Sequence, residues 1–340
     1  MKFWRIIAVA TAAEAVAVSA AAELLGLAGS WNGWLDVLNQ FAPIWLLLGL
    51  AGGGGMLALA PAGRARAGLL CTAAAAVAVS LLLVGPDLLA SIADEFQAHS
   101  RPPELKLVSF NVWSDNVDPE RTVEVILAAH PDVVLLQEEP GKLSAFEGRL
   151  LQFLPFRTAC PSGSDLAIFS ALPPIAKGCT TKPGAGPALD FDRPIWIRLQ
   201  ARDGREATLV TTHFQWPFPP GSRRAQLDEL ARTLPGLPTE NLILAGDFNL
   251  APWSFAMRQQ DKLLRPLIRR SHGIPTWPAR IGRLNLRPPF PLLAIDQVYA
   301  GAGWKRAWVQ RLPLAGSDHY GLAVSFYGDS GHIPGSHGRT

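Results

Sequence analysis

The sequence predicts an α/β protein in two parts, with three membrane-spanning helices ahead of a soluble domain. The first 100 residues are rich in Ala, Leu, Gly and Val and hold only 4 of the 31 basic and 6 of the 28 acidic side chains. After them, short apolar runs alternate with amphipathic segments, which is the pattern of an α/β fold. Polar residues directly follow several of those runs. The composition therefore places a boundary near residue 100 and points to a functional site beyond it.

Three hydrophobic stretches lie before the boundary, at about residues 3–27, 35–60 and 67–90. Each reaches the roughly 20 residues that cross a bilayer. The first could instead be a cleaved signal peptide that ends near Ala20-Ala21-Ala22. Its apolar region is longer than the usual ~7–15 residues, and two further spans follow it. We therefore expect three retained transmembrane helices and the lipid bilayer as a partner. No protein partner can be inferred.

The basic residues of this region predict its orientation. Lys2 and Arg5 flank the first stretch, and Arg64 and Arg66 lie between the second and the third. The connection between the first two holds Asp36 and no base. Because cytoplasmic loops carry the excess of Lys and Arg, we expect a cytoplasmic N-terminus. The soluble domain would then be periplasmic or extracellular.

The chain divides into four predicted regions. They are a membrane region over residues 1–95, a linker over 96–104, a soluble domain over 105–327 and a Gly/Ser/His-rich disordered tail over 328–340. Within the soluble domain, Cys160 and Cys179 bracket a probable strand. In an exported domain such a pair predicts a disulfide across a hairpin, although two unrelated buried thiols are the alternative.

Polar residues stand at the ends of the predicted strands. A strand over residues 105–110 ends at Asn111, a helix follows over 119–129, and the apolar run 133–136 ends before Glu138. Later strand ends carry His213, Asp247 with Asn249, Asp296, and Asp318 with His319. A buried acid is costly without a partner, so one such residue can be a satisfied core group. Several at successive strand ends indicate one shared site.

The order of these motifs resembles the endonuclease/exonuclease/phosphatase (DNase I-like) family. The matching pieces are Ser109-Phe-Asn111, Asp132-Val-Val-Leu-Leu-Gln-Glu138, Thr212-His213, Gly246-Asp-Phe-Asn249, Ile295-Asp296 and Ser317-Asp-His319. They cover about residues 105–326, so this chain resembles a membrane-anchored member. The resemblance implies a four-layer α/β sandwich, with two mixed sheets packed face to face and helices outside. The site would lie where the strand-end loops of the two sheets meet.

Carboxylate and amide oxygens suit Mg²⁺ or Mn²⁺ rather than the metals that prefer thiolate. The resemblance implies that Glu138 is the main metal ligand, with Asn111 beside it and Asp318 nearby. Whether one or two metal ions bind is not evident from these residues.

The resemblance also assigns catalytic roles. Asp247 would orient or deprotonate the attacking water, and Asn249 would hold that water or a phosphate oxygen. His319, held by Asp296, would contact the phosphate or act as a base, and His213 would bind the phosphate or act as an acid. Gln297 follows Asp296 where many relatives have His. No loop matches the one that repair endonucleases use around an abasic site, which weakens a DNA-repair interpretation.

The substrate is less well indicated. Arg193, Trp277 and Arg280 are candidate substrate contacts. Residues 258–287 form a basic strip with one embedded tryptophan and a single acid. Such a strip could follow a nucleic-acid backbone, meet anionic lipid headgroups, or be a solvated surface.

We expect a membrane-tethered, divalent-metal-dependent phosphodiester hydrolase, nuclease-like in its site, whose substrate is a phosphodiester of nucleic acid or phospholipid. A phospholipid, sphingomyelin or inositol-phosphate hydrolase is the alternative. A catalytically inactive binding domain is a third reading, and the retention of every site residue argues against it.

Overall fold

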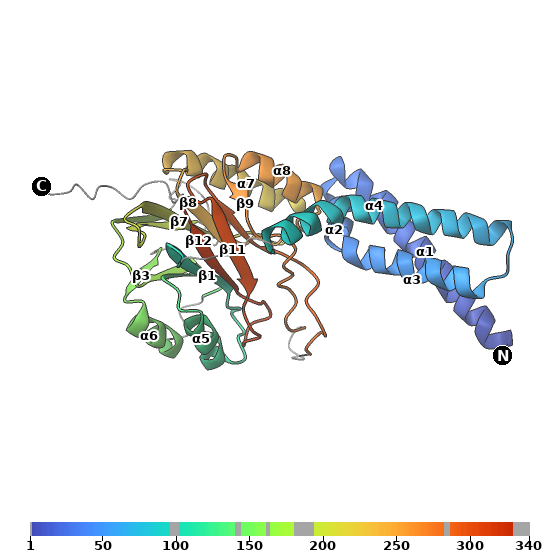
Figure 1. Ribbon diagram of the computed structural model, residues 1–340, viewed down its shortest axis with the longest axis horizontal. Coiled ribbons are helices and arrows are strands. Elements are labelled where there is room, and N and C mark those ends of the chain that lie inside the picture. The colour runs from blue at the N-terminus through green and yellow to red at the C-terminus, as the bar shows by residue number, and fades with distance from the viewer. Residues whose placement is uncertain are drawn as a thin grey trace, which may run out of the picture.

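A bundle of long helices extends from one end of an α/β domain, and the N-terminus lies at the far end of that bundle (Figure 1). The structure is a computed structural model, and it describes residues 2–95, 102–139, 144–160, 164–179, 194–281 and 286–328. Arg193, most of the predicted linker and all but the first residue of the predicted tail lie outside the described residues.

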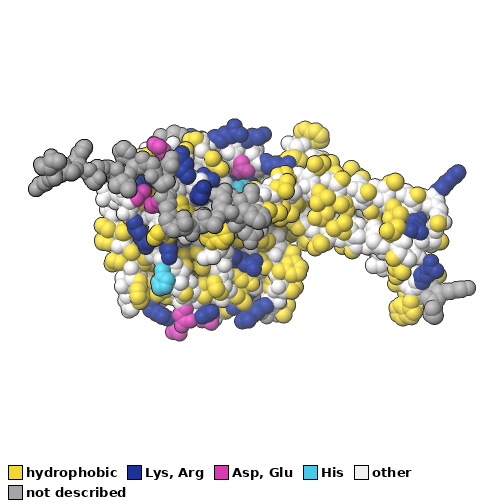
Figure 2. All heavy atoms as spheres, viewed as in Figure 1, with side chains coloured by type: hydrophobic (Ala, Val, Ile, Leu, Met, Phe, Trp, Pro, Cys, Tyr) yellow, Lys and Arg dark blue, Asp and Glu magenta, His cyan; other side chains and the backbone are white. Residues whose placement is uncertain are grey.

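Helices α1 (Lys2–Leu27), α3 (Ala42–Leu59) and α4 (Arg64–Glu95) are long and apolar enough to cross a membrane. They pack closely, since a Cβ atom on Gly52 would lie 2.8 Å from the carbonyl oxygen of Ala12 in the neighbouring helix. Figure 2 shows a largely hydrophobic bundle with basic side chains at its far end.

The second predicted span, residues 35–60, is two helices. A short 3-10 turn η1 (Ala28–Ser30) leads to α2 (Gly33–Gln40), and the chain breaks at Phe41 before α3. Pro43 in the first turn of α3 explains the break, because proline has no N–H to continue a preceding helix. The hydrophobic span is therefore shorter than predicted, and α2 belongs to the junction with the soluble domain.

Helix α2 is held to the soluble domain by its polar side chains. The two carboxylate oxygens of Asp36 accept hydrogen bonds from the backbone N–H groups of Phe255 and Ala256, at 2.9 and 2.8 Å. These groups begin helix α8 (Phe255–Leu263), so Asp36 caps that helix. Gln40 accepts from the N–H of Ala251 at 2.7 Å.

Helix α4 is 32 residues long, and its last turns lie against the domain. Pro86 inside it leaves the carbonyl of Leu82 without its usual donor, and Arg258 donates to the carbonyls of Leu82 and Leu83 at 3.4 and 3.0 Å. Asp87 accepts from Arg269 at 2.6 Å, and it also contacts His272 and the N–H of Gly273.

In the described residues the strands form two six-stranded mixed sheets. The first has the order β11 (Arg306–Arg311), β12 (Leu322–Tyr327), β1 (Leu105–Asn111), β2 (Val133–Gln137), β4 (Ala167–Ser170) and β3 (Phe156–Ala159). The second has the order β5 (Ala176–Cys179), β6 (Ile195–Gln200), β7 (Glu206–His213), β8 (Leu242–Asp247), β10 (Asp296–Ala300) and β9 (Ile268–Arg269). Strands β1 and β2 are parallel, as are β7 and β8.

The sheets pack face to face, and helices cover their outer faces. The central core joins residues of both sheets, such as Leu107 of β1 and Ile197 of β6. Helices α5 (Pro119–Ala128) and α6 (Ser144–Phe153) cover the first sheet, and α7 (Pro220–Thr233), a 3-10 turn η3 (Leu234–Gly236) and α8 cover the second. The predicted four-layer sandwich is therefore confirmed.

Cys160 and Cys179 are joined by a disulfide. Cys160 follows β3, which pairs with β4, whereas Cys179 ends β5, which pairs with β6 in the other sheet. The bond therefore links the edges of two sheets and not the two strands of a hairpin, because the chain crosses between sheets after β4.

Candidate active site

The predicted site residues that the structure describes meet at one edge of the sandwich. Parallel strands bring their carboxyl ends to the same edge, which places Asn111, His213 and Asp247 there with Glu138, the residue after β2. Asp296 begins β10, which is antiparallel to β8, and pairs with Asp247 in register. His319 precedes β12, which is antiparallel to β1.

The backbone of these loops is unusual in ways that position the side chains. Gly246 has φ +156°, and a Cβ atom there would lie 1.9 Å from the carbonyl oxygen of Thr212, so only glycine fits between β7 and β8. Glu138 and Asn249 have φ values of 54° and 48°, in the left-handed region that such residues rarely adopt. Non-glycine residues held in that region are typical of functional sites.

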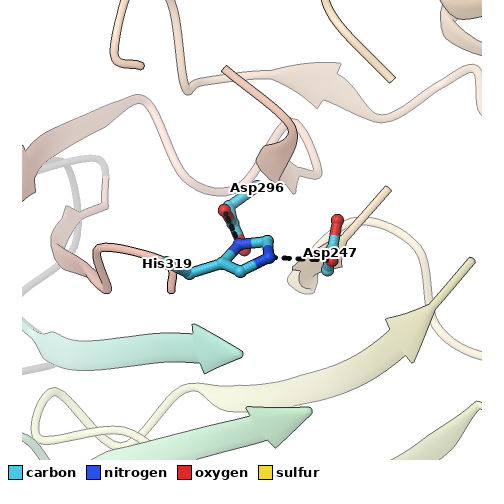
Figure 3. Close-up of side chains that lie close together, drawn as sticks. All are labelled: Asp247, Asp296 and His319. Carbon is cyan, nitrogen blue, oxygen red and sulfur yellow. Dashed lines mark hydrogen bonds and ion pairs between the residues drawn. The ribbon is translucent and has the colours of Figure 1, made fainter. Parts of the chain in front are cut away.

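Figure 3 shows His319 between two carboxylates. Its Nδ1 is 2.9 Å from Oδ2 of Asp296, and its Nε2 is 3.6 Å from Oδ2 of Asp247. Burial alone would lower the pKa of His319, but Asp296 and Asp247 outweigh it and raise the pKa to about 10. Without a bound cation the protonated form of His319 is therefore favoured, and its Nε2 faces Asp247.

Asp247 lies at the centre of the site. Its Oδ1 accepts from the N–H of Asn249 at 2.8 Å, and its Oδ2 accepts from the amide of Asn111 at 3.0 Å. Burial raises the pKa of Asp247 above its usual range, although His319 acts in the opposite direction. The side-chain amide of Asn249 donates to the carbonyl of Phe214 at 2.8 Å, which fixes that residue beside Asp247.

Glu138 and Asp318 face the same space. Glu138 accepts from the Asn111 amide at 3.0 Å and from the N–H of Ser114 at 3.2 Å. Burial would raise the pKa of Glu138, but the Asn111 hydrogen bond and the charge of His213 lower it. Asp318 accepts from the indole N–H of Trp277 at 3.2 Å, and burial raises the pKa of its carboxyl.

Asp165 is a site residue that the sequence did not indicate. Its Oδ2 is 2.7 Å from Nδ1 of His213. Burial would lower the pKa of His213, but Asp165 and Asp247 outweigh it and raise the pKa to about 9. Asp165 stands before β4, which is antiparallel to β2, so the start of this strand lies at the site edge. A search for polar residues before strands as well as after them would have found it.

The predicted substrate contacts differ in their placement. Trp277 joins the site through Asp318 and meets Trp216 edge to face, with ring centroids 5.6 Å apart. Arg280 is buried and donates to the carbonyl of Ala315 at 2.7 Å, so its guanidinium serves a structural contact.

The donor set fits a hard divalent cation. Ligand atoms of Asp247, Asp296 and His319 lie within 4.8 Å of one another. Oδ1 of Asp296 and Oδ1 of Asp318 are buried with no hydrogen-bond partner among the described residues. Buried carboxylate oxygens are ordinarily satisfied, and a cation would satisfy these. The cluster is therefore consistent with divalent metal binding.

Comparison with known proteins agrees with this geometry. The sequence model of the Endonuclease/Exonuclease/phosphatase family matches residues 108–319. No curated protein sequence matches the chain.

Several solved structures share the fold. Beta toxin from Staphylococcus aureus (TM-score 0.53) and the human Nocturnin catalytic domain with bound sulfate (TM-score 0.50) are each 18% identical in sequence. These similarities cover 66% and 67% of this chain and 100% of each of those chains. An endonuclease/exonuclease/phosphatase from Beutenbergia cavernae has a TM-score of 0.50 and 18% identity, over 66% of this chain and 71% of that one.

Proposed function

Since this chain belongs to the endonuclease/exonuclease/phosphatase family and is a hydrolase of phosphoric ester bonds, we propose that it cleaves a phosphodiester with Mg²⁺ or Mn²⁺ as cofactor. We also propose that three helices tether it to a membrane, with a cytoplasmic N-terminus and a periplasmic or extracellular catalytic domain. Arg5 lies near the start of α1, and Arg64 and Arg66 begin α4, so these bases support that orientation.

Glu138 and Asp318 would hold the cation, with Asn111 beside them. Glu138 supplies a partly exposed carboxylate, and Asp318 supplies a buried oxygen that has no hydrogen-bond partner among the described residues. When bound, the cation would neutralise charge on the phosphate and polarise its bond to the leaving oxygen.

The single observation that carries the reaction is the convergence of two fixed imidazoles on Asp247. His213 and His319 each have Nδ1 held by a carboxylate, and their Nε2 atoms lie 3.7 and 3.6 Å from Oδ2 of Asp247. Such pairs keep each imidazole protonated and oriented. A phosphate beside Asp247 would thus meet two cationic donors, which stabilise the charge that develops on its oxygens.

The remaining residues fit water attack. Asp247, fixed by the Asn249 N–H and the Asn111 amide, orients the water and accepts its proton. His319 then stabilises the phosphate oxygens. His213, at the other side of Asp247, donates a proton to the leaving oxygen, and Asp165 keeps it protonated.

Between the two substrate classes, the structure favours a substrate at the membrane surface over a polymeric nucleic acid. Much of the predicted basic strip is engaged internally, since Arg258 contacts α4, Arg269 pairs with Asp87, and Arg280 contacts Ala315. A continuous phosphate-binding track would need those side chains to face solvent.

Exposed aromatic residues instead lie between α2 and the site. Trp34 of α2 packs on Phe218, and Trp216 in the same loop packs on Trp277 beside Asp318. Trp34, Trp216 and Phe218 are 53%, 58% and 56% exposed. Aromatic side chains of this kind prefer the interface between membrane and water. These residues therefore favour a phospholipid or related phosphodiester over nucleic acid as the substrate.

A substrate panel tests the proposal. Full-length protein with Mg²⁺ would be assayed on phospholipid and sphingomyelin vesicles, DNA, RNA and bis(p-nitrophenyl) phosphate, with Asp247→Asn as the inactive control. We expect hydrolysis of the small diester and of a lipid, and Trp216→Ala should lower only the lipid rate. If no substrate is cleaved faster by the wild type than by Asp247→Asn, the chain is an inactive binding domain. A reporter fused after Phe326 should be active only outside the cytoplasm.

A further inference from the structure

A cavity of about 700 Å³ lies between the helix junction and the soluble domain. Its walls come from the segment that connects α1 to α2, from α2 itself, and from α7 and α8 (Figure 1). None of the candidate catalytic residues lines it.

The cavity is basic. Among the described residues that line it are four cations, Arg223, Arg224, Arg258 and Lys262, and one acid, Asp36. Asp36 already accepts hydrogen bonds from two N–H groups at the start of α8 and from the amide of Asn39. Arg224 also pairs with Asp228 at 3.3 Å, but Asp228 does not line the cavity, so the lining residues carry an excess of positive charge.

Arg223 is the buried cation among these four. It is only 5% exposed, donates to Gln260 at 2.6 Å, and forms no salt bridge with a described carboxylate. Its Nε is buried and has no hydrogen-bond partner in the described part of the chain. Burial lowers the pKa of this guanidinium to about 9, despite the more distant charges of Tyr299, Asp36 and Asp247. The contacts that Arg223 does make are all with neutral groups, namely Gln260, the carbonyl of Phe248 and the ring of Phe214 at 5.3 Å. An anion in the cavity would supply the missing opposite charge.

The position of the cavity indicates where that anion comes from. Trp31 lines it and is 89% exposed, directly after the first membrane-spanning helix. Tryptophan at the end of a span lies at the level of the lipid headgroups. Lys262 and Arg224 lie on the helices that face this level, where basic side chains attract anionic lipids.

We propose that this cavity binds the phosphoryl group of an anionic ligand, which an anionic phospholipid of the adjoining leaflet supplies. The guanidinium of Arg223 is the buried contact, and Arg224 and Lys262 are the outer ones. The site is separate from the catalytic centre, and the proposal does not depend on the reaction proposed above.

Binding to the full-length protein in an uncharged detergent tests this site. Short-chain phosphatidylglycerol, short-chain phosphatidylcholine and inorganic phosphate would be titrated separately, with the thermal unfolding midpoint as readout. Arg223 is a poor first variant, because it also donates to the carbonyl of Phe248 between two site residues. The double variant Arg224→Glu, Lys262→Glu removes the two outer contacts and one exposed ion pair, Arg224 with Asp228. Its matched control is Arg232→Glu, Arg265→Glu, which makes the same charge change on exposed residues that do not line the cavity.

We expect phosphatidylglycerol to stabilise the wild type and Asp247→Asn equally, and phosphatidylcholine to do so far less. The cavity variant should bind phosphatidylglycerol at least about tenfold more weakly, and the control should stay within about twofold of wild type. If inorganic phosphate is as effective as phosphatidylglycerol, the phosphoryl site stands and its ligand is soluble. The proposal is overturned if neither anion stabilises the protein, if both double variants lose binding equally, or if Asp247→Asn abolishes it.

Discussion

Two regions of this molecule bury carboxylates, and they use them differently. At the junction between helices and domain, both oxygens of Asp36 and both oxygens of Asp87 accept hydrogen bonds from backbone N–H groups or cationic side chains. At the catalytic edge, Asp165, Asp296 and Asp318 each keep one buried oxygen without a partner among the described residues. The two junction carboxylates are satisfied without a ligand, whereas these three carboxylates are not.

Whether a buried carboxylate has an unpaired oxygen indicates its role better than its burial does. A satisfied carboxylate stabilises the fold through its existing partners, and its loss leaves those partners unpaired. A carboxylate with a free oxygen retains capacity for a cation, a water or a substrate. We therefore expect substitutions at the junction to affect stability and substitutions at the catalytic edge to affect activity.

The largest effect should come from the centre of the catalytic edge. Asp247→Asn should lower kcat about 10³-fold or more, because it removes the acceptor for the proton of the attacking water. Glu138→Gln should mainly raise the Mg²⁺ concentration required, and His319→Ala should mainly lower kcat. Mg²⁺-dependent hydrolysis and thermal unfolding would be measured together. Wild-type activity in Glu138→Gln and His319→Ala would show that the site has been assigned wrongly.

Asp165→Asn should have a smaller effect, lowering kcat about 10- to 100-fold, because it frees an imidazole that Asp165 orients. The pH profile gives the more specific readout. If His213 must be protonated, activity falls as the pH rises through its pKa of about 9. Without Asp165 that pKa falls, so the alkaline limb should move to lower pH. If the rate falls equally at every pH and the alkaline limb of the pH–activity profile does not move, His213 is not the acid.

At the junction, Asp87→Asn should cost about 1.5–3 kcal/mol of stability, because it removes the charged acceptor of the buried Arg269 guanidinium, which then keeps only Asp261 as its carboxylate partner. The folded fraction should keep its kcat. The control is Glu124→Gln, which breaks an exposed pair with Arg121 and should cost less than about 1 kcal/mol. Chemical denaturation followed by Trp fluorescence would measure both variants. Equal costs would mean that the junction is not a buried electrostatic contact.

The last predicted effect is a pH dependence of stability in the metal-free protein. The pKa of His319 is raised from 6.5 to about 10 by its carboxylate partners, so the folded state binds its proton more tightly. The associated stability is fully present below pH 6.5 and is lost as the pH rises through about 10. The unfolding midpoint should fall over that window, and it should fall less in Asp296→Asn. A midpoint that is constant, or that rises, would contradict this.

Much of the fold could be predicted, because strand ends and family motifs are local in the sequence. The four-layer sandwich and the meeting of Asn111, Glu138, His213, Asp247 and His319 follow from strand direction once the order of motifs is known. Asp165 was missed because it precedes its strand and lies outside the family motifs, and the antiparallel pairing of β2 and β4 brings it to the site.

The break in the second span, the separation of the basic residues and the position of the disulfide depend on tertiary contacts, which cannot be predicted from hydropathy. Residues 35–60 look like one apolar span, yet Asp36 and Gln40 pack on the soluble domain. Arg258, Arg269 and Arg280 are close in sequence but contact different parts of the fold, so the basic strip is not one continuous basic surface. Cys160 and Cys179 are near in sequence and lie in different sheets.

Mn²⁺ binding measured by electron paramagnetic resonance tests the central claim most directly. The unpaired oxygens at the catalytic edge should make the full-length protein bind Mn²⁺, and Mg²⁺ should displace it. Glu138→Gln should weaken that binding at least about tenfold, whereas Glu124→Gln should leave it unchanged. If the wild type binds no Mn²⁺, or if Glu138→Gln binds it as tightly as the wild type, the catalytic edge is not the metal site proposed here.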